Sequence, residues 1–334
     1  MQVCPVKNTV PFAARAAAPK TEEPDVTQVD GVKMSMEDVA TILRPAPKPS
    51  HVAIGAICLG AMAVAAGRIA YDVASTGGVG LAVGTVAGLA AGYTAADWLG
   101  GHVHHFFDNY PAKTGDGFIN ETAAIFQTHH DWPHDMSESD IWHNTQHVGK
   151  FLAAPLVGLA AFTGAMHPAA AAFSLGALSG GFLAQAFHRY AHQKNPPAAI
   201  TFLQKTGLAV KPEPHFQHHK HPDDDYCLLN GMHNGWMQKT HYWRGVEAGI
   251  FKLGEAVGPN VRKAIGGTTD SWEPIAWKEY PSTRAFALGE IGEQQYLKQW
   301  ADERAAYHEE WKGNYARIKA EKTAEAQRVL SQNG

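Results

Sequence analysis

The chain has 334 residues, of which 45% are hydrophobic, and it carries a formal net charge of -4. This balance gives no support for a nucleic-acid partner, because such binding depends on clustered Lys and Arg. The cysteines, Cys4, Cys58 and Cys227, are too far apart for a zinc knuckle or an iron–sulfur motif, and their odd number disfavours a disulfide framework.

The first segment of the chain, residues 1–49, is rich in Pro, Ala and charged residues and has no sustained hydrophobic period. This composition predicts a flexible N-terminal tail with one short helix near the sequence SMEDVATIL. A cleaved signal peptide is not expected, because no apolar segment follows the first residues.

Three apolar stretches follow the tail. Residues 52–71 contain Arg68 as their only charged residue, residues 73–96 contain none, and residues 151–187 contain no Asp, Glu, Lys or Arg. Each of the first two is long enough for a spanning helix, which needs ~20 mostly apolar residues. The third is too long for one span, and Pro168 near its middle predicts a hairpin of two helices.

The composition of these stretches favours a membrane. Their many Gly and Ala residues would let helix backbones approach closely in lipid. A buried hairpin in a soluble bundle is the alternative, but Arg68 and His167 are the only residues in the three stretches that could carry charge. The sequence therefore predicts an all-α, multi-pass membrane protein with about four transmembrane helices.

The number of spans also predicts which segments share a face of the membrane. With four spans, the N-terminal tail, the segment from Asp97 to Lys150 and everything after the fourth span lie on one side, together with all dense histidine clusters. Lys and Arg are abundant on that side and absent from the two short opposite loops. By the positive-inside rule we expect this face, and a metal site on it, to be cytoplasmic.

We divide the chain into the tail 1–49, a transmembrane and catalytic domain 50–240, and a polar, largely helical extension 241–334. In the extension, residues 283–332 carry aromatic and apolar side chains at helical spacing, including Trp300 and Trp311. An amphipathic helix of this kind either packs on its own domain, which we favour, or lies on the bilayer surface.

Histidine is concentrated in one part of the chain, because all of the 19 histidines except His51 and His308 lie between His102 and His241. Four clusters stand out, and they read DWLGGHVHHFFDNY, FQTHHDWP, FHRYAH and HFQHHKH. The residues that we single out as candidate metal ligands are His104, His129, His130, His188, His192, His215, His218 and His219. Within a helix, a spacing of four residues places two such side chains on the same face.

The number of histidines predicts two metal ions. Neutral imidazole is a good ligand for Zn, Cu, Fe and Ni, whereas eight histidines exceed the four to six positions of a single ion. For a single histidine, a hydrogen bond or an exposed position is the simpler explanation, but the combined spacings at the ends of spanning helices favour a metal site. Two irons at a membrane face indicate O2 activation on a lipid chain, since unactivated C–H bonds need a strong oxidant.

The motifs DWLGGHVHHFFDNY, FQTHHDWP, FHRYAHQ, PPAAITFLQKTGLAV and HFQHHKHPDDDYCLLNGMHN, with Asn144 between them, resemble in order and spacing the lipid desaturase domain family. This family includes plant chloroplast fatty acid desaturases and plasmanylethanolamine desaturases. The resemblance covers roughly residues 52–240, and DNY, HHDWP and LQKTGLAV are most similar to the plant branch.

The resemblance implies a multi-span membrane desaturase with a non-haem di-iron centre, that is, two Fe ions held by the eight histidines. It also implies that Asp108 belongs to the site and that Asn144 is an outer or water-mediated ligand, and we group both as catalytic. The expected substrate is a chain within a phospholipid, with O2 as the oxidant. The chain has no haem or iron–sulfur motif, so the electrons are expected from a separate donor such as ferredoxin or cytochrome b5.

Three other functions stay open at this point. Formation of a plasmalogen vinyl ether and hydroxylation use the same chemistry, while a histidine-rich metal transporter or sensor belongs to another class. Transporters place their ligands near the bilayer midplane, whereas the clusters here lie just outside the spans.

The fourth cluster departs from the family pattern. It is one residue shorter before the Tyr-Cys pair, and it carries Asp223, Asp224 and Asp225 where neutral polar residues are usual. We expect His221 and these aspartates to form a solvated turn.

Overall fold

The computed structural model describes residues 26–29, 32–44, 46–113, 116–134, 136, 139–267 and 271–333. Most of the expected flexible tail, residues 1–25, lies outside this part of the chain. The described residues are largely helical, which confirms the predicted fold class, with one addition. A short hairpin pairs β1 (Val26–Val29) antiparallel with β2 (Val32–Ser35) and leads directly into α1 (Met36–Leu43), the short helix expected from the sequence.

Among the described residues, four helices are long and apolar enough to cross a membrane, in agreement with the sequence. They are α2 (Pro49–Thr76), α3 (Val79–Asn109), α6 (Ile141–Phe162, extended by the short helical turn η1, Thr163–Ala165) and α7 (Pro168–Ala191). His167 caps α7, its Nδ1 accepting a hydrogen bond from Ala169 N (3.3 Å), and Pro168 begins the helix, which makes the predicted hairpin turn.

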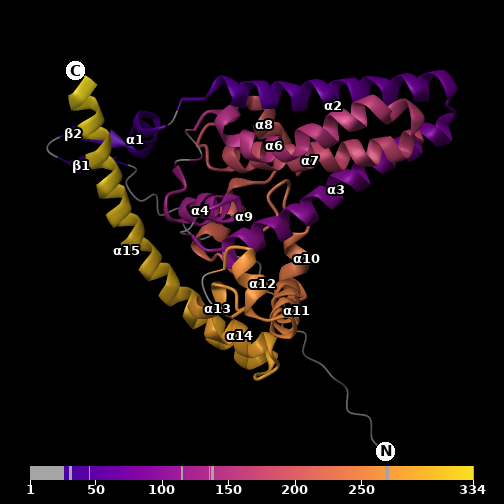
Figure 1. The fold of residues 1–334 in the computed structure, drawn as a ribbon. Coiled ribbons are helices and arrows are strands. Elements are labelled where there is room, and N and C mark those ends of the chain that lie inside the picture. The colour runs from indigo at the N-terminus through magenta and orange to yellow at the C-terminus, as the bar shows by residue number, and fades with distance from the viewer. Residues whose placement is uncertain are drawn as a thin grey trace, which may run out of the picture.

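The remaining helices are shorter, except for the last. They are α4 (Phe118–Asp131), α8 (Ala198–Thr206), α9 (Pro212–Lys220), α10 (Asn234–Lys239), α11 (Tyr242–Val257), α12 (Pro259–Ala264), α13 (Ala276–Glu279), α14 (Pro281–Ala287) and α15 (Glu293–Asn333). Figure 1 shows α2, α6 and α7 running side by side, with α3 crossing obliquely beneath them toward α4 and α9.

Small residues bring α3 and α7 into backbone contact. A Cβ added at Gly92 of α3 would lie 2.0 Å from the carbonyl oxygen of Phe173, and one added at Gly176 of α7 would lie 2.3 Å from that of Leu89. Gly88 lies four residues before Gly92 and Gly180 four residues after Gly176, so each pair shares one face of its helix, and a Cβ at either would also be too close to the other helix. The predicted close packing of small residues is thus present where the two histidine-bearing helices meet.

The two ends of the described chain meet on one side of the bundle. The long helix α15 passes α4 and reaches α1 and the hairpin (Figure 1). Met36 and Val39 of α1, Ala326 of α15 and Trp132 form a buried apolar cluster. The C-terminal helix therefore packs on its own protein, as the sequence favoured.

We expect the substitution Gly176→Ala to lower the thermal unfolding midpoint of the purified protein in detergent by several degrees. The new methyl group would overlap the backbone of Leu89 and Tyr93, and overpacking of this kind costs about 1–3 kcal/mol. Gly84→Ala is the matched control, because a Cβ at Gly84 meets no atom within 4 Å. Equal midpoints for the two variants would contradict the close approach of α3 and α7.

Candidate metal centre

Five histidines from three elements turn a ring nitrogen toward one point. They are His129 of α4, His188 and His192 at the end of α7, and His215 and His219 of α9, and their ligand atoms all lie within 4.8 Å of one another. All except His192, which is partly exposed, are buried. We call these residues the five-histidine group.

The spacing of these nitrogens fits a single metal ion. His129 Nε2 lies 3.1 Å from His188 Nε2 and 3.0 Å from His192 Nε2, and His215 Nε2 lies 2.7 Å from His192 Nε2 and 3.0 Å from His219 Nε2. Two nitrogens bound at right angles to one metal, at about 2.1 Å each, would be about 3.0 Å apart. Neutral imidazole has one N–H to donate, so five convergent rings cannot all satisfy one another by hydrogen bonds.

A second group lies beside the first and contains a carboxylate. Asp108 Oδ2 is 3.1 Å from His104 Nε2, 3.3 Å from His130 Nε2 and 3.5 Å from His218 Nε2. All four side chains are buried, and neither oxygen of Asp108 accepts a hydrogen bond of normal geometry from a described residue. A buried carboxylate without such bonds is costly, and a cation bound here would compensate for it. We call these residues the Asp108 group.

The adjacent histidine pairs divide between the two groups. In α4, His129 belongs to the five-histidine group and His130 to the Asp108 group, and in α9 His219 and His218 divide in the same way. Consecutive residues on a helix point about 100° apart, so one short helix can reach two neighbouring sites. The arrangement fits two metal positions side by side, as the histidine count predicts.

Hydrogen bonds fix the orientation of two rings in the Asp108 group. The Nδ1 atom of His104 lies 3.0 Å from the carbonyl oxygen of Tyr226, and that of His218 lies 2.6 Å from the carbonyl oxygen of Asp224. A carbonyl only accepts, so each Nδ1 carries the proton and each Nε2 keeps its lone pair. This second-layer arrangement is typical of metal-binding histidines.

Burial also favours the neutral form of several of the candidate ligands. It lowers the pKa of His192, His215 and His219 well below the ordinary value of 6.5, and the other imidazoles nearby lower it further. The pKa of His130 is likewise lowered by burial, although Asp108 opposes the shift. Neutral imidazole is the form that binds a metal, so the donor set suits one at neutral pH.

Several other histidines near the clusters have structural roles. His105 stacks on Trp243 with ring centroids 4.7 Å apart, and its Nε2 lies 3.4 Å from a carboxylate oxygen of Glu247. His102 Nε2 lies 2.8 Å from the Tyr242 hydroxyl. These contacts account for His102 and His105 without a metal ion.

Asp97, which shares a helical face with His104 and Asp108, holds a loop instead of a metal. Its Oδ1 accepts hydrogen bonds from the backbone N–H groups of Leu229 (3.2 Å), Asn230 (3.0 Å) and Gly231 (3.1 Å). Hydrogen bonds from backbone N–H groups to a carboxylate are stronger than bonds between neutral groups. Asp97 therefore anchors the turn that follows the fourth cluster.

The expectation of a solvated turn at the three aspartates is wrong. Asp223, Asp224 and Asp225 are 0%, 7% and 6% exposed, and His221 is half-buried. The sequence did not indicate the burial of Asp223, because its partners Arg244 and Arg304 belong to α11 and α15, which come later in the chain.

Asp223 is the centre of a buried ionic cluster. Its carboxylate lies 3.7 Å from Arg244 Nη1 of α11 and 3.5 Å from Arg304 Nε of α15, and it accepts a hydrogen bond from Trp300 Nε1. The carbonyl oxygen of Asp223 accepts a further bond from Arg244. Arg244 is shared between Asp223 and Glu247, whose Oε1 lies 3.1 Å from Arg244 Nη2, and Arg304 comes from α15. The loop after α9 is therefore tied to both α11 and the C-terminal helix.

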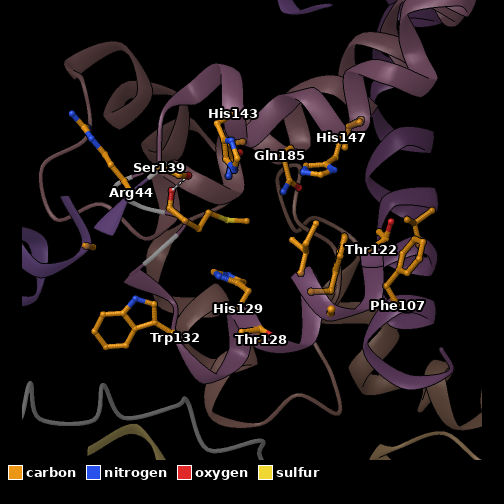
Figure 2. Close-up of a pocket in the computed structure, with 18 of the residues that line it drawn as sticks. Arg44, Phe107, Thr122, Thr128, His129, Trp132, Ser139, His143, His147 and Gln185 are labelled. Carbon is orange, nitrogen blue, oxygen red and sulfur yellow. Dashed lines mark hydrogen bonds between the residues drawn. The ribbon is translucent and has the colours of Figure 1, made fainter. Parts of the chain in front are cut away.

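An apolar cavity of about 770 Å³ reaches the five-histidine group. Its wall includes Phe107 of α3, Phe126 of α4 and Phe151 of α6, together with His129. In Figure 2, His129 projects into the middle of the cavity, with Phe107 and Thr122 on one side and Trp132 on the other. These wall residues are spread over many elements, and no pattern in the sequence groups them.

Asn144 lies on the same cavity, in the first turn of α6. Its side chain is 7% exposed, and Oδ1 accepts no hydrogen bond from the described residues. A buried amide oxygen in this state is costly, so it is ready to accept a bond from a bound water or ligand. The roles of Asp108 and Asn144 in catalysis stay predictions.

Residues 93–260, slightly more than half of the chain, match the lipid desaturase domain family. The chain belongs to this family. The match contains both candidate ligand groups, and it confirms the resemblance seen in the sequence motifs. It leaves out α1, α2 and α15, so part of the cavity wall comes from outside the matched residues.

Two relatives illustrate the breadth of the lipid desaturase family. The chloroplastic fatty acid desaturase 4 of Arabidopsis thaliana is 29% identical over 172 residues, 49% of this chain and 51% of that protein. The plasmanylethanolamine desaturase of Myxococcus xanthus is 25% identical over 185 residues, 52% of this chain and 65% of that protein. The aligned region thus spans between about half and two thirds of these relatives, and no solved structure matches significantly.

We expect His218→Ala to reduce the metal bound per chain by half or more, because His218 belongs to the Asp108 group. His102→Ala is the control, since His102 is on α3 near the site but lies within hydrogen-bond distance of Tyr242. Elemental analysis of purified, metal-loaded protein measures the difference. Full metal content in His218→Ala would remove this residue from the site.

We expect Asp223→Asn to lower the free energy of unfolding by about 3 kcal/mol or more, because removal of one partner from a buried ion pair leaves the other charge uncompensated. Glu321→Gln is the control, as its pair with Arg317 is 60% and 61% exposed and such pairs contribute about 0–1 kcal/mol. Unfolding of both variants in detergent tests this. Similar stabilities would show that the Asp223 cluster does not hold α15.

Proposed function

We propose that this protein is an O2-dependent, non-haem di-iron desaturase that introduces a double bond into a fatty acyl chain of a phospholipid. The observation that carries the proposal is the apolar cavity that meets His129 of the five-histidine group. A redox-capable metal pair beside a cavity for an apolar chain is the arrangement that this chemistry requires. Membership of the lipid desaturase family supports the same conclusion.

The cavity suits a lipid chain better than a polar substrate. Its wall is dominated by Phe, Val, Ile, Leu and Ala, and no Asp or Glu occurs among its described lining residues. A volume of about 770 Å³ falls within the range of about 300–1,000 Å³ that is usual for small-molecule sites. Because the cavity is lined by α3 and α6, two candidate spanning helices, a membrane lipid could reach it directly.

The donor set supports iron. Iron is bound well by histidine nitrogens and carboxylate oxygens. Among the described residues, neither group contains a thiolate, which would favour structural zinc. Iron bound here would supply O2 activation and removal of hydrogen from an unactivated carbon. In the balanced reaction, two hydrogen atoms are removed from adjacent carbons, which leaves an alkene. O2 is reduced to two water molecules by these two hydrogen atoms together with two protons and two electrons from an external donor.

The residues of this chain prepare the site for that reaction. The carbonyl oxygens of Tyr226 and Asp224 hold His104 and His218 in orientation through their Nδ1 atoms. Phe107 and Phe126 keep the cavity beside His129 apolar and exclude water. Asn144 offers a buried amide oxygen on the cavity wall, where it could hold a water near the site.

Two further parts of the proposal rest on the sequence. The metal site lies on the cytoplasmic side according to the distribution of Lys and Arg, and the electrons come from a separate donor such as ferredoxin or cytochrome b5. The division into a tail 1–49, a catalytic domain 50–240 and an extension 241–334 is also proposed.

A plasmalogen-forming reaction is the second candidate, supported by the similarity to the Myxococcus xanthus plasmanylethanolamine desaturase. It would use the same site and differ in the bond formed, a vinyl ether in place of an acyl alkene. The metal transporter is disfavoured, because the ligands belong to the ends of α3 and α7 and to α4 and α9, outside the middle of the spans.

We expect new unsaturated phospholipids in cells that express the protein and none in cells that express His218→Ala. Mass spectrometry of the lipids distinguishes an acyl alkene, which supports the first candidate, from an acid-labile vinyl ether, which supports the second. Protein purified without O2 should contain two irons per chain. An unchanged lipidome, or stoichiometric zinc or copper without O2 uptake, would contradict the proposal.

The substitution Val148→Trp, measured in the same lipid experiment, tests whether the cavity holds the substrate chain. Val148 of α6 lines the cavity, and a larger side chain there should reduce product formation while metal content stays unchanged. The control is Val157→Trp on the same helix, where the side chain is 48% exposed on the outer face. Full activity in Val148→Trp would place the substrate elsewhere.

A further inference from the structure

We propose that α11 and α12 lie in the surface of the lipid bilayer and insert Leu253, Val257 and Val261 among the acyl chains. These helices follow the four candidate spans, and the candidate metal ligands belong to other elements. The proposal therefore goes beyond the proposed function and holds independently of the reaction. It also changes the role of the extension 241–334, whose first part becomes a membrane-surface segment.

α11 buries charged side chains and exposes apolar ones. Arg244 and Glu247 are 5% and 0% exposed and pair with each other, with Arg244 Nη2 3.1 Å from Glu247 Oε1. On the outside, Leu253 and Val257 are 64% and 47% exposed, and Val261 of α12 is 46% exposed. A helix bordered by water normally presents its charged side chains outward and its apolar ones to the core. The outer faces of α11 and α12 are therefore suited to apolar surroundings.

The apolar residues on the outside of α11 form one strip. They recur at spacings of three and four residues, which places them on one face of the helix. The exposed Lys252 and Glu255 point about 100° and 160° away from Leu253. A helix with an apolar strip beside charged side chains is typical of the plane between lipid and water. The strip consists of Val246, Ile250, Leu253 and Val257, of which the first two are half-buried.

Aromatic side chains mark the membrane interface where α11 begins. Trp98 of α3 and Trp236 of α10 are 39% and 42% exposed. The centroid of the His102 ring lies 4.2 Å from that of Trp98 and 5.6 Å from that of Tyr242. The Tyr242 and Trp236 centroids are 5.2 Å apart. Because Trp and Tyr concentrate at the level of the lipid headgroups, these contacts indicate that α3, α10 and α11 meet the same interface.

The position of Trp98 along α3 sets the depth of this interface. Trp98 follows the uncharged stretch 73–96 and the first charged residue after it, Asp97. α3 therefore leaves the apolar part of the bilayer near Trp98. Leu99 and Val103, just beyond this point, are also exposed. The apolar surface of α3 thus extends to the part of the helix that contacts α11.

α11 lies against α3 on a side that the other candidate spans leave open. His102 Nε2 is 2.8 Å from the Tyr242 hydroxyl, and the ring of His105 stacks on that of Trp243. In Figure 1, α10 and α11 lie below α3, whereas α2, α6 and α7 lie above it. Lipid is therefore the neighbour of α3 beside α11 in a membrane, and the apolar strip can enter it.

Spin labels attached to single cysteines measure whether the strip lies in lipid. The variants Leu253→Cys and Val257→Cys are made in the full chain with Cys4→Ser, since Cys58 and Cys227 are buried. The labelled proteins are reconstituted in phosphatidylcholine vesicles. The collision rate of each label with O2, which concentrates in lipid, is then divided by its collision rate with a water-soluble nickel chelate.

Two reference labels bracket this ratio. Val64→Cys, on an exposed position of the candidate span α2, gives the value for lipid, and Glu321→Cys, on the exposed side of α15, gives the value for water. Glu255→Cys is the matched control on α11. We expect the labels at Leu253 and Val257 to give the lipid value, several times higher than the ratio at Glu255, which should give the water value.

The water value at Leu253 and Val257 would overturn the membrane contact. Labels at these positions that neither reagent reaches would show that protein, such as a second copy of this chain, covers the strip, and would also overturn it. Only variants with the thermal unfolding midpoint of the unlabelled protein are compared, and Val261→Cys repeats the test on α12. The measurement needs no turnover, so its outcome is separate from that of the lipid experiment.

Discussion

The backbone contact between α3 and α7 is the constraint on which the metal centre depends. α3 carries His104 and Asp108 at its end, and α7 carries His188. Because Gly92 and Gly176 leave no room for a Cβ, the two helices can approach far enough for imidazoles from both to face neighbouring points. In lipid, helix association relies on such packing, since the apolar solvent provides little hydrophobic drive between helices.

The close approach of α3 and α7 gathers buried nitrogen and oxygen atoms, and only some of them have hydrogen-bond partners. Nine side chains in the two groups direct metal-binding atoms inward. In His104 and His218 the other ring nitrogen, Nδ1, donates a hydrogen bond to a backbone carbonyl, so Nε2 is the atom that points inward. Apolar surroundings do not satisfy the ring lone pairs that point inward. The helix packing therefore brings together donor atoms whose lone pairs a bound cation would satisfy.

Local patterns in the sequence predicted the spans, the hairpin turn at Pro168 and the eight histidines, because apolar length and helical spacing are local properties. The number of histidines also indicated two metals, although the division of each adjacent pair between two groups required the orientation of α4 and α9. The burial of Asp223 was missed, since its partners Arg244 and Arg304 are 21 and 81 residues further along the chain. The cavity was missed for the same reason, as no periodic signal joins Leu43, Phe107 and Phe151.

The meeting of α1 and α15 makes the cavity depend on both ends of the described chain. Met36 and Val39 near the start and Ala326 near the end form one buried cluster with Trp132, which also lines the cavity beside His129. A truncation within α15 would therefore disturb the cavity wall although it removes none of the candidate metal ligands.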